Sequence, residues 1–112
     1  MHVREKIVGE VVILSIKGEI LDVEDDLRFQ QKISSLIVDG VRKVVVDLAD
    51  VERLNSRSLS ALQSAAKAMH QIAGDIRFTG MDGHVNDIFV ETKLTRSFPR
   101  FETVGRAAAS FS

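Results

Sequence analysis

The chain has 112 residues, of which 45% are hydrophobic and 28% are charged, a composition typical of one compact globular domain. Its formal net charge of −1 gives no electrostatic reason to expect a nucleic acid or an anionic membrane surface as partner. Cysteine is absent, which excludes disulfides, thiolate nucleophiles and cysteine-ligated metals. The apolar runs are far shorter than the roughly 18 residues of a membrane span, and the N-terminus lacks the apolar core of a signal peptide. We therefore expect a cytoplasmic protein without membrane insertion.

The first two predicted strands form a hairpin. Residues 3–8 and 11–16 are rich in β-branched and other apolar residues, and only Gly9 and Glu10 separate them. The second strand alternates poorly between apolar and polar residues, so we expect both of its faces to be covered.

A helix is predicted after the turn at residues 18–22. Asp22 is a suitable N-cap, and three acidic residues follow at 24–26, where the helix dipole favours negative charge. Gly40 is the predicted C-terminal stop. The apolar face of this helix consists of Phe29, Ile33, Leu36 and Ile37.

A third strand over residues 42–48 leads into a second helix that begins near Ser56 and runs to about residue 73. Steps of three and four place five apolar residues on one face of this helix, namely Leu59, Leu62, Ala66, Met69 and Ala73. Gly74 is predicted to end it, and the alternation of Ile76, Phe78 and Gly80 predicts a fourth strand.

The C-terminal part is predicted to hold a helix over residues 85–92, a short strand around Phe101 and an alanine-rich helix over 104–111. Strands that alternate with helices favour an α/β fold. We expect residues 1–112 to form a single domain, with a mixed β-sheet of about four to five strands and about four helices packed against it.

Ser56 is the candidate functional residue because it lies where a strand leads into a helix. A serine at that point can cap the first turn, and the positive end of the helix dipole would tolerate a phosphate there. Two interpretations follow from the residue alone: a capping serine without a regulatory role, or a site of phosphorylation. Two interpretations also hold for the neighbouring acidic residues Asp22, Asp47 and Asp50. Either they form an acidic rim that contacts a partner, or they are ordinary solvated aspartates in turns.

An enzymatic function is disfavoured by the same segment. A hydrolase nucleophile elbow needs glycine two residues to either side of the serine, and Leu54 and Ser58 stand there instead. The histidines at 2, 70 and 84 have no spacing that supports a catalytic triad or a metal site. No glycine-rich phosphate loop is present. We therefore predict no catalytic residues, no metal and no cofactor.

The order of elements and the Ser56 junction resemble the STAS domain of bacterial anti-sigma factor antagonists over essentially the whole chain. In that family the third strand ends in a D-L-S-x-V-x-F-[IM]-D-S-[ST]-G-L pattern, and residues 47–59 of this chain read DLADVERLNSRSL. Residues 18–22, GEILD, resemble the family's G-x-L-D turn with one extra residue. Residues 92–94 and 101–103, TKL and FET, resemble its T-G-L and F-x-T segments.

The resemblance implies an anti-sigma factor antagonist that sequesters a serine-kinase anti-sigma factor while Ser56 is unphosphorylated, and so regulates sigma-factor-dependent transcription. The kinase would have the histidine-kinase-like ATPase fold, and a serine phosphatase is a further candidate partner. Phosphorylation would fall on Ser56 and would oppose docking. The expected partner-binding residues are Asp22, Asn55, Ser56, Arg57, Ser58, Ser60, Gln63 and Lys67, with Ser64 on the same face.

The chain departs from the family pattern close to Ser56. Asn55 stands for aspartate, Arg57 for the second serine or threonine, and Ser58 for glycine; Lys93 replaces the glycine of T-G-L. These changes leave the apolar positions intact, so the fold prediction is unaffected. They leave open an alternative function, in which the domain is a non-phosphorylated scaffold or adaptor of a signalling assembly or transport system.

Overall fold

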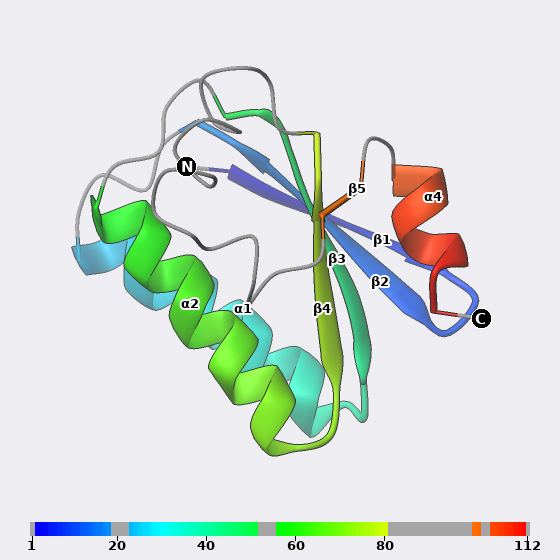
Figure 1. The fold of residues 1–112 in the computed structure, drawn as a ribbon. Coiled ribbons are helices and arrows are strands. Elements are labelled where there is room, and N and C mark those ends of the chain that lie inside the picture. Colours follow the sequence, from blue (N-terminus) through cyan, green and yellow to red (C-terminus); the bar gives the residue numbers. More distant parts are fainter. Residues whose placement is uncertain (1, 19–22, 52–55, 81–99, 102–103, 112) are drawn as a thin grey trace.

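Five strands form one mixed sheet in the computed structural model, which describes residues 2–18, 23–51, 56–80, 100–101 and 104–111 (Figure 1). Their spatial order is the same as their order in the chain. β1 (His2–Val8) and β2 (Val11–Lys17) are the antiparallel hairpin that the sequence predicts, and β3 (Lys43–Asp50), β4 (Asp75–Thr79) and β5 (Arg100–Phe101) add in parallel.

Helices cover both faces of this sheet in the described part of the chain. α1 (Val23–Val38) and α2 (Ser56–Gln71) lie side by side on one face, and the short α4 (Val104–Ala109) lies on the other (Figure 1). The predicted mixed α/β fold is confirmed. The helix predicted over residues 85–92 lies outside the described residues. None of the described helices is long and apolar enough to cross a membrane.

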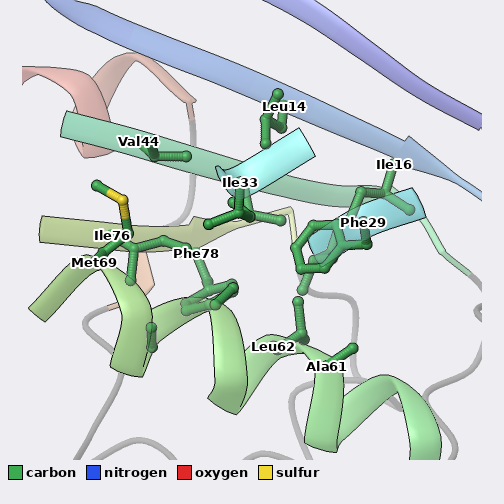
Figure 2. Packing of buried hydrophobic residues seen from close by; sticks show 14 of the residues in the cluster. Leu14, Ile16, Phe29, Ile33, Val44, Ala61, Leu62, Met69, Ile76 and Phe78 are labelled. Carbon is green, nitrogen blue, oxygen red and sulfur yellow. The ribbon is translucent and has the colours of Figure 1, made fainter. Parts of the chain in front are cut away.

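The main core lies between the sheet and the α1–α2 layer. α1 contributes Phe29 and Ile33, which are almost fully buried, and α2 contributes Leu62 and Met69 (Figure 2). Burial of a side chain of this size stabilises the fold by about 1.5 to 3 kcal/mol. The sheet side of the same core consists mainly of Val12, Leu14, Ile16, Val44, Val46, Leu48, Ile76 and Phe78.

A smaller core lies beneath α4 on the opposite face. Val11, Ile13 and Val45 pack there against Ala107. The Arg77 guanidinium also lies 3.9 Å from the centre of the Phe111 ring, a cation–π contact. β2 thus has apolar residues buried on both faces, as its poor alternation predicts.

Both long helices end in the same hydrogen-bonded turn. In α1 the turn contains Gly40 at φ +87°, and Val41 donates its N–H to Leu36 O at 2.9 Å. In α2 the left-handed residue is Ala73 at φ +58°, and Gly74 donates to Met69 O at 2.8 Å. Gly40 therefore ends α1 as predicted.

The predicted apolar face of α2 needs one correction. Ala73 lies beyond the end of the helix and is exposed, so it does not belong to that face. The reason is the left-handed turn, which directs the chain away from the helix axis before residue 74. Leu59 packs at the margin of the core, and the buried face consists of Ser58, Ala61, Leu62, Ala65, Ala66 and Met69.

Candidate functional site

The site lies at the edge of the sheet where the parallel strands end. β2, β3 and β4 run in the same direction, so their C-terminal ends meet at one edge, and α2 begins there at Ser56 (Figure 1). Open parallel sheets commonly bind their ligands at the carboxyl ends of their strands. The candidate residue from the sequence is therefore at an edge suited to recognition.

Hydrogen bonds within the turn and from the end of β2 hold the end of β3. Asp47 accepts a bond through Oδ1 from the backbone N–H of Ala49 at 3.0 Å, and Gly18 N donates to Asp50 O at 3.4 Å. Val51 donates to Leu48 O at 3.0 Å and is buried. Val51 is therefore fixed at the end of β3, and the Asp47 carboxylate has a local role in the turn, as aspartates in turns usually do.

Gly80 brings the end of β4 into direct contact with the end of β3. Its φ is +76°, and a Cβ atom added there would overlap Asp47 Oδ1 and would lie 2.6 Å from Ala49 N and 2.9 Å from Ala49 Cα. Real Cβ atoms do not approach backbone so closely, so only glycine fits without a shift of the end of β3. The alternation that predicts β4 includes Gly80, but nothing in the sequence indicates this close approach.

The outer face of α2 is polar and open. Ser60, Gln63 and Lys67 are all exposed, and Ser64 lies beside them. Their spacing of three, four and seven residues places them on one face, which is opposite the buried one. The structure thus brings these predicted partner-binding residues together on one accessible surface.

Ser58 lies on the other side of α2, contrary to the prediction that it contacts a partner. Its exposed fraction is 1%, so a docked protein cannot reach it in this conformation. The physical reason is helical periodicity, since Ser58 stands four and seven residues before Leu62 and Ala65 on the core face. The sequence shows this spacing, but Ser58 was predicted to be exposed because its side chain is polar.

Two predicted site residues, Asp22 and Asn55, lie outside the described residues. Ser56 is the first residue of α2, and Arg57 is the second. The first turn of this helix contains no acidic residue, so no carboxylate of the turn itself opposes an added phosphate there.

Gln30 is a further residue near this surface that the sequence analysis missed. It projects from α1 and donates through Nε2 to Ala61 O of α2 at 2.9 Å and to Asp26 Oδ1 at 3.3 Å. The bond fixes the position of α1 beside the N-terminal half of α2. The sequence alone does not indicate that a glutamine in an amphipathic helix will bond to the backbone of a second helix. Among the described residues, no three histidine, aspartate or glutamate side chains are grouped so that they could hold a metal ion.

Comparison with known protein families identifies the family of this chain. The profile of the STAS domain matches residues 2–107, almost the whole chain. This chain belongs to the STAS domain family. The resemblance seen in residues 47–59 is thereby confirmed at the level of the family.

Two relatives of this STAS domain are named as anti-sigma factor antagonists. A protein of Thermotoga neapolitana named as an anti-sigma factor antagonist is 27% identical over 103 residues, which cover 91% of this chain and 90% of that protein. The anti-sigma factor antagonist BtrV of Bordetella bronchiseptica is 25% identical over 84 residues, which cover 75% of this chain and 72% of BtrV.

Two solved structures are similar to this chain over nearly their whole length. The crystal structure of an anti-sigma factor antagonist from Thermotoga maritima has a TM-score of 0.87 and 26% sequence identity, with 96% of this chain and 92% of that chain covered. The unphosphorylated form of the anti-sigma factor antagonist SpoIIAA has a TM-score of 0.72 at 17% identity, with 97% of this chain and 96% of that chain covered. At that identity the likeness to SpoIIAA shows the fold alone.

Proposed function

We propose that this STAS domain is an anti-sigma factor antagonist whose binding is switched by phosphorylation of Ser56. The observation that carries the proposal is the position of Ser56 as the first residue of α2, at the carboxyl edge of the parallel strands and beside the exposed polar face of that helix. The relatives named as anti-sigma factor antagonists support it.

In the unphosphorylated state, the exposed face of α2 docks on the anti-sigma factor. Ser60, Gln63 and Lys67 provide hydrogen-bond donors and acceptors and one positive charge without any loss of core packing. Docking sequesters the anti-sigma factor and releases the sigma factor, so transcription from its promoters rises.

Phosphorylation opposes docking through charge and desolvation. A phosphoserine has about −1.5 to −2 charges at neutral pH, and burying that charge against a surface that accepted a neutral hydroxyl is unfavourable. The domain itself does not need to refold, because the N-terminus of a helix stabilises an anion. The switch is therefore a local change of charge at the docking surface.

The phosphoryl donor is ATP held by the partner, a serine-kinase anti-sigma factor with the histidine-kinase-like ATPase fold. Transfer forms a bond between Ser56 Oγ and the γ-phosphorus, breaks the bond to the β,γ-bridging oxygen and leaves ADP. A serine phosphatase that hydrolyses the phosphoserine restores the docking state. We expect this exchange to take place in the cytoplasm.

Incubation with ATP and an anti-sigma factor that has the histidine-kinase-like ATPase fold tests the switch. We expect the intact mass to rise by one phosphoryl group in the wild type and to stay unchanged in Ser56→Ala. A phosphate mapped to another serine would contradict the assignment. Tight binding of the ATPase without any phosphorylation would favour the alternative of a constitutive scaffold or adaptor.

The docking face is tested separately by charge reversal. Lys67→Glu should weaken binding of that ATPase, whereas Arg28→Glu, the same change of charge on the exposed side of α1, should leave the affinity unchanged. Equal effects of the two variants would mean that net charge, and not the face of α2, determines binding.

A further inference from the structure

Within the described part of the chain, β1 is an open edge of the sheet. Among those residues it pairs only with β2, and six of its seven residues are exposed along the length of the strand. Alternate residues of an edge strand direct their backbone N–H and C=O groups outward, where a further strand can pair with them. An extended segment of another chain would therefore find a row of free hydrogen-bonding groups here.

The side of β1 that faces away from α1 and α2 is cationic. The register places His2 opposite Lys17, and Arg4 and Lys6 point to the same side of the sheet as His2. In the described structure none of these four side chains forms an ion pair. The positive charge on this side of β1 is thus available to a ligand.

A hollow of about 680 Å³ adjoins these side chains. It is lined by His2, Arg4, Lys17 and Ser15, and two carboxylates, Asp47 and Asp50, close it on the β3 side, with Val3 as the remaining lining residue. The surplus of positive charge therefore lies over β1, and a long acidic side chain placed there would be directed toward β1 and not toward β3.

The other side of β1 is largely apolar and partly open. Ile7 is 67% exposed and borders a second hollow, of about 400 Å³, next to Val12 and Val41. Val3 packs against the main core, and Glu5 between them is already paired with Lys32 at 2.7 Å. A strand added to β1 would thus meet apolar side chains on this side and cations on the other.

A second copy of the chain does not suit this edge. Two copies of one strand related by a two-fold axis pair antiparallel, and residues opposite each other then differ in number by zero or an even amount. His2, Arg4 and Lys6 would face one another in every such register that pairs most of β1, and like charges directly opposite each other are destabilising.

We propose that β1 is a docking edge for an extended segment of a partner protein in which acidic and apolar residues alternate. The segment adds to the sheet as a sixth strand, its acidic residues face Arg4 and Lys6, and its apolar residues face Val3 and Ile7. α1 contacts β1 through the Lys32–Glu5 pair and α2 contacts β4, so β1 is separate from the exposed face of α2.

A nine-residue, fluorescently labelled peptide of alternating glutamate and valine tests the proposal against the intact protein. We expect saturable binding and shifts of the β1 amide resonances. A peptide of the same composition with its glutamates and valines in separate blocks should bind about tenfold more weakly, because it cannot meet both sides of β1 at once. Equal binding of the block peptide, or of an oligothymidylate, would mean a non-specific polyanion surface and would overturn the proposal.

Two further measurements separate strand addition from simple charge attraction. Peptides methylated on every second backbone nitrogen, in the two possible phases, should differ, because only one phase removes the N–H groups that face β1. The double variant Arg4→Glu, Lys6→Glu should no longer bind the glutamate–valine peptide and should bind a lysine–valine peptide instead. The matched control, Arg28→Glu, Lys67→Glu, has the same change of net charge, and because neither residue lies on β1 it should bind both peptides as the wild type does.

Absence of binding, or identical affinities for the two methylated phases, would overturn the docking edge. The charges of β1 would then serve only to keep the edge from pairing with other chains.

Discussion

Substitution of Gly80 by alanine isolates the contact between the ends of β3 and β4. An alanine in the left-handed region costs about 1 to 2 kcal/mol by itself. At Gly80 the new methyl group would also lie 2.6 Å from Ala49 N, and such overpacking typically costs a further 1 to 3 kcal/mol. The sum predicts a loss of about 2 to 5 kcal/mol, a large part of the 5 to 15 kcal/mol that stabilise a domain.

Gly40→Ala is the matched control. Gly40 has φ +87°, and no atom lies within 4 Å of a Cβ built there, so this variant reports the backbone cost alone. Equilibrium unfolding in urea should show the larger decrease for Gly80→Ala. Because the clash displaces Ala49, which lies seven residues before Ser56, the rate of the proposed phosphorylation of Ser56 should fall in this variant only. Equal losses of stability in the two variants would mean that the close contact of Gly80 with Ala49 does not position the end of β3.

The remaining predictions concern the ends of α2. Ser56→Asp should leave the free energy of unfolding within about 1 kcal/mol of the wild type, since a carboxylate is favourable at a helix N-terminus, whereas Ser58→Asp should be strongly destabilising because it buries a charge. Thermal unfolding followed by circular dichroism measures the stability of both variants. Similar unfolding midpoints for the two variants would be incompatible with the burial of Ser58. Ala73→Gly should raise the stability by about 0.5 to 1 kcal/mol, since it relieves an alanine at φ +58°; a loss of stability in urea unfolding would contradict the left-handed turn.

The helices and strands of this chain are predictable from local pattern where the pattern is strong. The face of Phe29, Ile33 and Leu36 recurs with the helical period, and all three residues are buried in the main core. The end of α1 is equally local, because glycine at position 40 adopts φ +87° without steric cost. α2 was predicted to end two residues late, since an alanine at position 73 resembles a helical residue and not a turn.

The candidate site could be predicted only in part. The exposed positions of Ser60, Gln63 and Lys67 follow from the period of α2, and α2 begins at Ser56, where the strand-to-helix junction was predicted. The burial of Ser58 is the error in this set. Polarity and periodicity disagree at that position, and periodicity, which is imposed by the backbone, determines which side chains face the sheet.

The sequence by itself determined the alternation of strands and helices and the serine at the start of α2, because these depend on the spacing of neighbouring residues. Only the tertiary structure decided the strand order and register. These bring Gly80 against Asp47 and Ala49, place Gln30 against Ala61, and leave β1 at the edge with Arg4 and Lys6 on one side. Such contacts join residues that are far apart in the chain, and they form only when the two sides of the core pack together. Their geometry therefore depends on the whole fold and not on any local pattern.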